Sequence, residues 1–382
     1  MISRIKYYAN IWKWASHYPY KEARTFQVFR DFLNMHHQNG VSLTEYENFN
    51  MFSKDNQFRS AFLCIEERRL YLDLLNPILY HNCARNKYIT HKMFEGTGIK
   101  TSELYCFYQP ESKVYINSNM TDIADSVSGV CQILQRKNVK ECVIKVIDSS
   151  HGDGVIVVKS INYIDDDAIV KIYDGQEKKM SELLAEKSLI FESVIKQSQQ
   201  LASFNESSVN CIRFMTTLYP DGSAKVIGGF IKIGRRGKCI DNAGSGGNID
   251  AGVNFDTGEI YNVCQFDGWD KILKIRKHPD SGILIEGAII ENWEKIKAEV
   301  IRYQQAFPYC KAVGWDIAIT DDGPVVVEIN DAWDPTGQLF ANKGWRNEIR
   351  DCYLAWKATG KEWPNRVPCH LTAKQRSRLL EE

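Results

Sequence analysis

The sequence predicts an α+β fold with largely antiparallel sheets, and two candidate hairpins carry that prediction. Residues 314–330, GWDIAITDDGPVVVEIN, read as two short strands around an Asp321-Asp322-Gly323 turn. Residues 210–234 contain Asp221-Gly222, the strongest short-range hairpin signal. Helical and strand segments are mixed along the chain and hairpins recur, which argues against a doubly wound parallel sheet.

Size and charge describe an ordinary globular protein. The chain has 382 residues, of which 44% are hydrophobic and 25% charged, so it is long enough for two or three domain-sized units. Lys plus Arg and Asp plus Glu are both 48, giving a formal net charge of zero. With no overall positive field and no long basic run, the sequence does not predict a nucleic-acid partner.

The cysteines and the hydropathy suggest where the protein works. Eleven cysteines are scattered without a C-x-x-C pair, so neither a zinc ribbon nor a thioredoxin motif is indicated. No signal peptide is recognisable, and we therefore expect free thiols in a reducing cytoplasm. No apolar run approaches the roughly 18 residues that a membrane-spanning helix needs.

The first 85 residues are expected to be helical. Ser42, followed three residues later by Glu45, is a candidate helix cap. Apolar and aromatic residues recur at helical spacing near the N-terminus, with basic residues between them. Such a helix could lie at a bilayer interface or pack on its own protein, and we favour packing. The apolar residues are Ile2, Ile5, Tyr8, Ile11, Trp12 and Ala15, and the basic ones are Arg4, Lys6 and Lys13.

After residue 85 the residue pattern changes from helical to a mixture of helix and strand. The segment NKYITHKMFEGTGIKT predicts a helix that Gly96 and Gly98 end, followed by a strand. Strands are expected within 140–158 and 189–196 and across 209–263, a helix at 291–306, and helices again from about 340. We therefore divide the chain into a helical region (1–85), two subdomains (86–205 and 206–340) and a helical tail (341–382).

A strand, a small-residue loop and a second strand make up residues 141–158, ECVIKVIDSSHGDGVIVV. Lys145 falls inside the first strand, where an unpaired ammonium would be costly to bury. Ser149, Gly152 and Gly154 lie in the loop, and such small residues let backbone N–H groups approach an anion. The pattern fits a nucleotide phosphate site, or equally a plain hairpin with Lys145 facing solvent.

The 210–234 hairpin predicts a pair of cations on one sheet face. A two-residue turn would pair Pro220 with Ser223 and Cys211 with Lys232. Arg213 would then be the diagonal neighbour of Lys232. Two cations on one face need an anion between them, such as a phosphate that Arg holds with two hydrogen bonds. The alternative is a solvated outer face.

The 314–330 hairpin predicts a cation site. The assumed turn brings Asp316 opposite Glu328, with Asn330 two residues further on the same face. The same register pairs Ile317 with Val327 and Ile319 with Val325. Two facing carboxylates repel unless they share a cation or a proton, and oxygen ligands of this kind suit Mg²⁺. The remaining apolar positions argue against the alternative, a surface hairpin with exposed acids.

Taken in order, these motifs resemble the ATP-grasp superfamily over about residues 86–338. The resemblance rests on NKYITHK, on the strand lysine and glycine loop in VIKVIDSSHGDGV, and on the apolar segment LIFESVIKQ. It continues through VNCIRFMTT, the glycine-rich loop in IKIGRRGKCIDNAGSGGNID, and VVVEIN. The residue patterns of these motifs are most similar to those of the sugar-transfer-associated branch. The resemblance implies two α+β subdomains that sandwich ATP, here behind a helical N-terminal extension.

The resemblance also implies roles for individual residues. ATP phosphates would contact Lys145 and Lys87 or Lys92, with Ser149 and the Gly152–Gly154 loop closing over them. Residues Glu192 to Val194 would form the adenine hinge. Arg213, with Lys232 beside it, would stabilise the transferring phosphoryl group, and Asp316, Glu328 and Asn330 would hold Mg²⁺.

The implied activity is an ATP- and Mg²⁺-dependent carboxylate–amine ligase that works through an acyl phosphate. Its substrates would be small molecules, an amino acid or similar group joined to a sugar acid or glycan precursor in polysaccharide biosynthesis. A kinase of the same fold and a non-catalytic nucleotide-binding scaffold are the alternatives. No cysteine or histidine is needed for this chemistry, so His151 stays unassigned.

Overall fold

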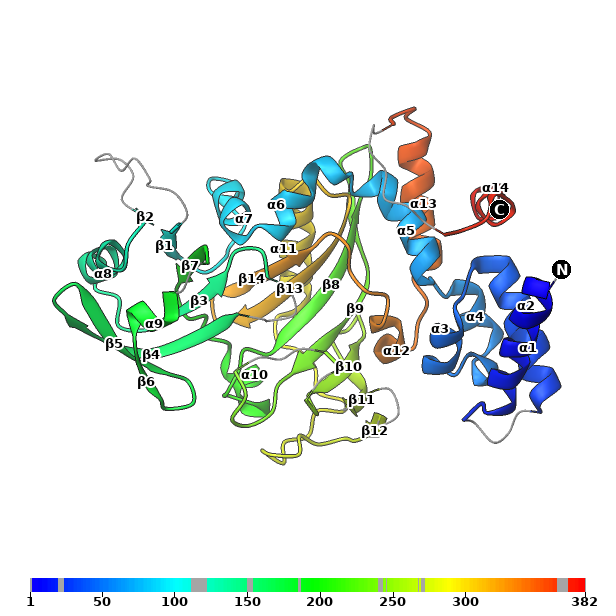
Figure 1. Cartoon of the computed structure of the whole chain (residues 1–382), viewed down its shortest axis with the longest axis horizontal. Helices are drawn as coiled ribbons and strands as arrows, with labels where there is room; N and C mark the ends of the chain where they lie inside the picture. Colours follow the sequence, from blue (N-terminus) through cyan, green and yellow to red (C-terminus); the bar gives the residue numbers. More distant parts are fainter. Residues whose placement is uncertain are drawn as a thin grey trace.

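The computed structural model describes residues 2–19, 24–110, 122–149, 154–184, 187–239, 243–244, 246–266, 268, 272–362 and 370–381. Its parts follow one another along the long axis of the molecule (Figure 1). N-terminal helices form one end, a seven-stranded sheet of β8–β14 the middle, and a seven-stranded sheet of β1–β7 the other end. The predicted α+β class is confirmed.

The described residues before position 86 are helical wherever they form regular structure, as expected. Ser42 caps α3 as predicted: its Oγ accepts a hydrogen bond from the Glu45 backbone N–H, and the Glu45 carboxylate accepts one from the Ser42 N–H. The elements are α1 (Ile2–Ser16), α2 (Thr25–Asn39), α3 (Leu43–Asn48), η1 (Met51–Ser53), α4 (Asn56–Ala61), α5 (Ile65–Leu75), η2 (Ile78–Tyr80) and α6 (His81–Arg85).

The first sheet has the strand order β2-β1-β7-β3-β4-β5-β6, and only the β1–β2 pair is parallel among its described ladders. Helix α7 (Lys87–Phe94) precedes it, and α8 (Val127–Arg136) and α9 (Met180–Leu184) pack on it. The strands are β1 (Leu104–Tyr108), β2 (Ile123–Ala124), β3 (Cys142–Val146), β4 (Val155–Ile164), β5 (Asp167–Ile172), β6 (Glu177–Lys179) and β7 (Leu189–Glu192).

Helix α10 (Gln199–Phe204) precedes the second sheet. All described ladders of this sheet are antiparallel, and its strand order is β12-β11-β10-β9-β8-β13-β14. Its strands are β8 (Cys211–Leu218), β9 (Ala224–Ile233), β10 (Ile249–Val253), β11 (Ile260–Phe266), β12 (Ile272–Lys274), β13 (Ala312–Thr320) and β14 (Gly323–Asn330). The later helices are α11 (Trp293–Ala306), α12 (Gly337–Ala341), α13 (Arg346–Lys357) and α14 (Ala373–Glu381).

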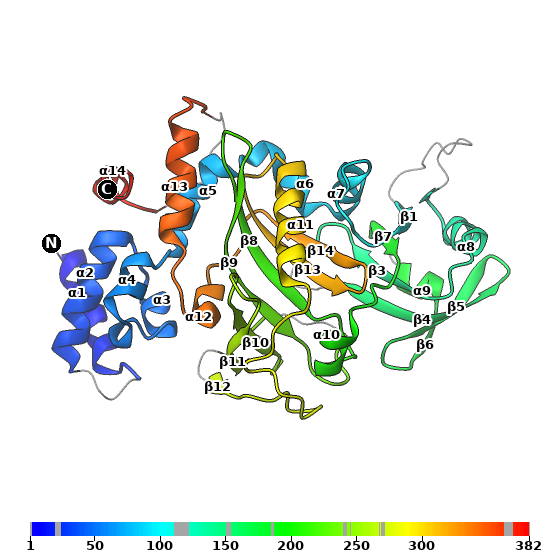
Figure 2. The ribbon, with the colours of Figure 1, turned by 180° about the vertical axis from the view of Figure 1, so that it is seen from behind.

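The second sheet has one face for its core and one for charged side chains. Figure 2 shows α11 lying across β8 and β13. Phe214 and Trp315 belong to the same buried cluster as Trp293 and Val300 of α11. Because side chains alternate along a strand, Arg213 and Asp316 point to the opposite face. Burial of the α11 side therefore fixes which way the charged residues point.

Both predicted hairpins form, each with a turn length and a register shift that the sequence did not reveal. Asp316 pairs with Glu328 and Cys211 with Lys232, as expected. Other predicted pairs are wrong. A bulge places Ile317 opposite Val326 and Ile319 opposite Pro324, and the turn pairs Thr320 with Gly323. In the other hairpin the Tyr219 N–H bonds to the Ser223 carbonyl, so the turn holds three residues, and a register shift between Met215 and Thr216 restores the Cys211–Lys232 pair.

The N-terminal stripe divides between two environments. Ile11 and Ala15 are buried in a cluster with helices α2 and α4, as the packing interpretation expects. Ile5, Tyr8 and Trp12 are instead exposed, so packing accounts for only part of the stripe. No helix in the described ranges is long and apolar enough to span a bilayer.

The boundary near residue 85 stays a prediction, although hydrophobic contacts extend across it. Tyr71 and Leu75 of α5 share a buried cluster with Met215 of the second sheet and Ile349 of α13. Arg346 of α13 also forms an ion pair with the buried Glu67 of α5 at 2.7 Å. Helices α5 and α13 therefore pack together beside the second sheet, from opposite ends of the chain.

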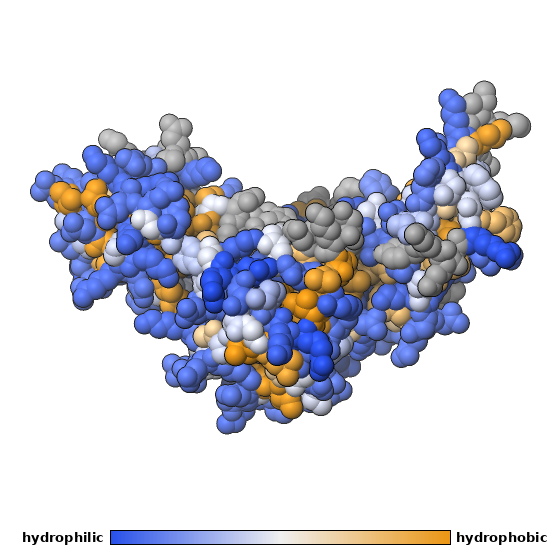
Figure 3. Space-filling view, turned by 90° about the horizontal axis from the view of Figure 1, so that it is seen from below, coloured by the Kyte–Doolittle hydropathy of each residue, from blue (hydrophilic) through white to orange (hydrophobic). Residues whose placement is uncertain are grey.

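Apolar side chains also reach the surface on the underside of the second sheet, as Figure 3 shows from below. Leu273 of β12 is exposed, and so are Ile283, Leu284 and Ile289 in the segment that follows. The ten cysteines in the described parts of the chain are free thiols, and Cys369 lies outside them.

Candidate functional site

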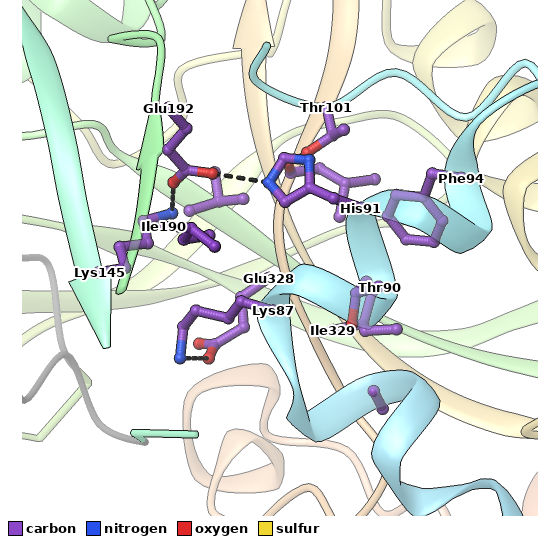
Figure 4. Close-up of a pocket in the computed structure, with 13 residues that line it drawn as sticks. Lys87, Thr90, His91, Phe94, Thr101, Lys145, Ile190, Glu192, Glu328 and Ile329 are labelled. Carbon is purple, nitrogen blue, oxygen red and sulfur yellow. Dashed lines mark hydrogen bonds and ion pairs between the residues drawn. The ribbon is translucent and has the colours of Figure 1, made fainter. Parts of the chain in front are cut away.

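A small cavity lies where the two sheets meet, and it is lined by side chains of both (Figure 4). Lys145 and Glu192 come from the first sheet, Glu328 from the second, and Lys87 and His91 from helix α7. The cavity volume is about 30 Å³, room for one or two waters. Charged side chains therefore fill the junction, and a ligand of nucleotide size would have to displace some of their contacts.

Lys145 and Glu192 form a buried ion pair on neighbouring strands β3 and β7. The second carboxylate oxygen of Glu192 lies 2.8 Å from His91 Nε2 and accepts a hydrogen bond of 2.7 Å from the Ser102 hydroxyl. Burial alone would raise the pKa of Glu192, but Lys145 and His91 hold it at about 2. Burial would likewise lower the pKa of Lys145, yet Glu192 raises it above the ordinary value.

This pairing has a testable consequence for stability. Glu192→Gln leaves the buried Lys145 without its carboxylate, so we expect a loss of about 3–5 kcal/mol in the free energy of unfolding at pH 7. The native pKa of Glu192, about 2, lies below its ordinary value of 4.5. Its stabilising effect is therefore complete above pH 4.5 and is lost as the pH falls towards 2.

Urea unfolding of both proteins at pH 7 and at lower pH measures this effect. The difference between wild type and Glu192→Gln should shrink as the pH falls. Glu177→Gln, an exposed change on edge strand β6 of the same sheet, is the control and should cost little at either pH. A constant difference across the pH range would contradict the assignment.

Lys87 connects three parts of the site. It is the first residue of α7, and its backbone N–H bonds to the Ile147 carbonyl at the end of β3. Its ammonium donates to the Ser149 carbonyl at 2.6 Å and lies 3.7 Å from Glu328 of β14. Burial lowers the pKa of Lys87 below its usual value, against the opposing effect of Glu328. Lys87 thus joins the loop after β3 to the hairpin of the second sheet.

Arg213 and Lys232 do share a face, as predicted, and both contact Asp316. The guanidinium of Arg213 holds the carboxylate with two hydrogen bonds of 2.6 and 2.8 Å, and Lys232 Nζ lies 3.0 Å from it. Burial would raise the pKa of Asp316, but the two cations hold it at about 2. In this structure the anion between the cations is a protein carboxylate.

The three predicted metal ligands lie on one hairpin face. Asp316 is directly opposite Glu328, and the Asn330 amide nitrogen is 3.5 Å from the Asp316 carboxylate. A β-bulge adds Val327 beside Glu328, and bulges often re-aim a side chain next to a functional site. The oxygens of these three side chains are a donor set of the kind Mg²⁺ takes, and a carboxylate has lone pairs for more than two partners.

Within the described ranges no three His, Cys, Asp or Glu side chains gather as a metal site. A cation here would therefore need the Asn330 amide oxygen, with water or phosphate, to complete its shell. Asp316 would share its carboxylate between such a cation, Arg213 and Lys232. The residues fit a Mg²⁺ ion that is bound together with a phosphate substrate.

The remaining predicted residues lie outside the cavity or outside the described part of the chain. Lys92 does not reach the cavity: it pairs with Glu95 at 2.9 Å and Asp122 at 3.0 Å. Val194 is half-buried in the segment after β7. Gly154 opens β4 at φ +74°, and a Cβ there would lie 2.5 Å from Val146. Gly152 and His151 lie outside the described residues.

Two side chains of the site were not predicted. His91 could have been found, because it lies four residues after Lys87 and so shares a helix face with it. Ser102 carries no local signal, since it reaches Glu192 from a segment 90 residues away. Both complete the hydrogen bonding of one buried carboxylate.

Comparison with solved structures gives distant likenesses. Phosphoribosylamine–glycine ligase from Thermotoga maritima is 10% identical with a TM-score of 0.40, and the match covers 77% of this chain and 59% of that one. For biotin carboxylase from Campylobacter jejuni the values are 9%, 0.39, 74% and 48%. For a D-cycloserine synthetase they are 11%, 0.38, 74% and 73%. The chain spans about half the length of the carboxylase.

Comparison with curated protein sequences gives no match. The model of one protein family, the sugar-transfer-associated ATP-grasp proteins, matches residues 66–352, about three quarters of the sequence. That range contains every charged residue of the cavity and the whole second sheet. It also begins 20 residues before the segment in which the motifs resembled the superfamily. This chain belongs to the sugar-transfer-associated ATP-grasp family.

Proposed function

We propose that the protein is an ATP- and Mg²⁺-dependent carboxylate–amine ligase that forms an acyl phosphate. One observation supports this above all: two lysines and Glu328 line the cavity where the two sheets meet, and two more cations hold Asp316, which lies opposite Glu328 on the second sheet. The hairpin offers Asp316, Glu328 and Asn330, and the cations are Lys87, Lys145, Arg213 and Lys232. Phosphoryl transfer needs charge neutralisation and positioning more than it needs a protein nucleophile.

The first chemical step joins a substrate carboxylate to phosphate. A carboxylate oxygen forms a bond to the γ-phosphorus of ATP while the bond from that phosphorus to the β–γ bridging oxygen breaks, and ADP leaves. Arg213 and Lys232 would neutralise charge on the moving phosphoryl group, and their contacts with the anionic oxygens of Asp316 support this role. Mg²⁺, when bound, would supply further charge neutralisation and orient the phosphates.

In the second step an amine nitrogen attacks the acyl carbon. The new C–N bond replaces the C–O bond to phosphate, inorganic phosphate leaves, and the nitrogen loses a proton. The membership in a sugar-transfer-associated family supports a sugar acid or glycan precursor as one substrate. The other would be an amino acid or similar group. The work of the protein side chains is to bind, to orient and to neutralise charge.

Hydroxylamine trapping tests the reaction class. The purified protein would be screened for ADP release with amino acids and uronic-acid sugars, and active pairs repeated with hydroxylamine. An acyl phosphate yields a hydroxamate, whereas direct phosphorylation of a hydroxyl does not. ADP release without hydroxamate, together with a phosphorylated product, would replace the ligase by a kinase.

Lys87 should matter more for phosphate than for adenosine. Lys87→Met removes an ammonium that now lies between the Ser149 carbonyl and Glu328, and that we expect to turn to the phosphates of ATP. We expect ATP affinity to fall by about tenfold or more, the loss of one charged hydrogen bond.

Calorimetry with ATP and with adenosine measures this difference, and adenosine binding should change little. Lys92→Met is a matched control on the same helix, because that lysine pairs with Glu95 and Asp122 outside the cavity. Equal losses for both ligands would place Lys87 away from the phosphates.

A further inference from the structure

The first two helices expose an aromatic and basic surface at the end of the molecule. Ile5, Tyr8 and Trp12 follow one another at positions i, i+3 and i+7, so they share one side of α1. Phe26 of α2 extends this surface, because Phe29, one turn further along α2, lies edge-on against Trp12 with ring centroids 5.3 Å apart. We call Ile5, Tyr8, Trp12 and Phe26 the aromatic face.

The aromatic face is not a seam of the protein's own core. Ile5 is 65% exposed, Trp12 45% and Phe26 60%. The residues that attach these helices to the core lie elsewhere on them: Ile11 and Ala15 on α1, and Val28, Phe32 and Met35 on α2. Large apolar side chains that stay exposed together mark an interaction surface more often than an accident of composition.

Positive charge surrounds the aromatic face. Lys6 and Lys13 each follow an aromatic-face residue by one position, so they form a row beside Ile5 and Trp12. Arg24 and Arg30 are exposed near Phe26. Residues 1–30 contain six Lys or Arg and one Glu, although the whole chain has equal numbers of acidic and basic residues. The charge is therefore concentrated at this end.

This combination indicates what the face would bind. A second copy of the chain would bring the same lysine rows against one another, and like charges at close range repel. An anionic bilayer offers the complementary arrangement: headgroup phosphates for Lys and Arg, and an interfacial layer where Trp, Tyr and Phe rings are stable. Basic residues beside an aromatic row are the usual composition of a helix that lies on a membrane.

The location is compatible with such binding. Figures 1 and 2 both place α1 and α2 at the opposite end of the molecule from the first sheet, with the second sheet between them. A bilayer contacting α1 and α2 would not cover the cavity between the two sheets. Attachment would hold the enzyme near a membrane while its site stays open.

We propose that the aromatic face of α1 and α2 docks the protein on anionic lipid bilayers as a peripheral contact. The proposal does not depend on the ligase activity. Docking would favour an acceptor that is itself held at a membrane surface. It would also be reversible, because the apolar contribution comes from four side chains and the remainder is electrostatic and screened by salt.

Vesicle co-sedimentation tests the proposal with the full chain. We expect binding to vesicles of mixed phosphatidylglycerol and phosphatidylcholine, little binding to pure phosphatidylcholine, and release by high salt. Lys6→Glu with Lys13→Glu should weaken binding by roughly 20-fold or more, at about fivefold for each positive charge removed. Ile5→Ser with Phe26→Ser should weaken it by at least about tenfold.

Matched controls distinguish docking from unfolding and from nonspecific hydrophobic adsorption to vesicles. Leu79→Ser with Ile164→Ser removes two large exposed apolar side chains far from α1, and should leave binding unchanged. Circular dichroism and the melting temperature confirm that each variant is folded. The proposal is overturned if the wild type does not bind anionic vesicles. It is also overturned if the control double substitution weakens binding as much as the double substitution in the aromatic face. A dimer that Ile5→Ser with Phe26→Ser dissociates would show that a second copy covers the face.

Discussion

Glu328→Gln is expected to reduce ADP formation by at least about 100-fold while the protein stays folded. The substitution keeps the shape of the side chain but removes the negative charge with which Glu328 would help to hold a Mg²⁺ ion. Metal stabilisation of a phosphoryl transition state is worth several kcal/mol, and each 1.4 kcal/mol is about tenfold in rate. Initial rates at saturating ATP and Mg²⁺ measure the effect.

Stability should hardly change in this variant. Facing carboxylates would be expected to repel, but Asp316 is neutralised by Arg213 and Lys232, and Glu328 is one-third exposed with Lys87 at 3.7 Å. We therefore expect a shift in melting temperature of only about 2 °C or less. Asp321→Asn removes a carboxylate from the exposed turn of the same hairpin and should leave turnover intact. Unchanged turnover in Glu328→Gln would remove this residue from the metal site.

Arg213→Ala should reduce kcat far more than it raises KM for ATP. In the structure the guanidinium donates two hydrogen bonds to the Asp316 carboxylate, which Lys232 also contacts. Charge in that position matters most as the phosphoryl group moves, and loss of one such donor typically costs about 10²–10³ in rate. Arg302→Ala, an exposed change on the α11 side of the second sheet, is the control for kcat.

Arg213→Lys should recover little of the lost rate. Lysine restores the charge but not the two-pronged contact, so it would hold Asp316 and the phosphoryl group less well. If Arg213→Ala changes only the apparent affinity for the acceptor, Arg213 binds the substrate carboxylate. The transfer chemistry would then rest on Lys232 and Mg²⁺.

The register of both hairpins shows what the sequence could and could not predict. Asp316 opposite Glu328 and Cys211 opposite Lys232 were predicted correctly, although the predicted turn of each hairpin has the wrong length. The bulge at Val327 and the three-residue turn after Tyr219 were not predicted, because an added residue leaves no signal in an apolar strand. In each hairpin the difference in turn length and the register shift offset each other, so the two pairs were still correct.

Long-range pairing was the harder part of the site. Lys145 was expected either to contact phosphate or to face solvent, and it lies buried against Glu192, 47 positions later. His91 and Ser102, which come from two further segments, contact the same carboxylate. Such contacts depend on how the first sheet folds, and strand periodicity predicts only which face each side chain occupies. Helix α8 and strands β5 and β6 were also not foreseen, although half of α8 and most of β5 are apolar.

The proposed ligase has to bind ATP together with Mg²⁺ at the junction of the two sheets. Calorimetric titration of a non-hydrolysable ATP analogue, with and without Mg²⁺, tests this requirement most directly in wild type and in Glu328→Gln. We expect tight binding to wild type that depends on Mg²⁺, and loss of that Mg²⁺ dependence in Glu328→Gln. Nucleotide binding that is the same with and without Mg²⁺ in wild type, or no binding at all, would contradict the proposal.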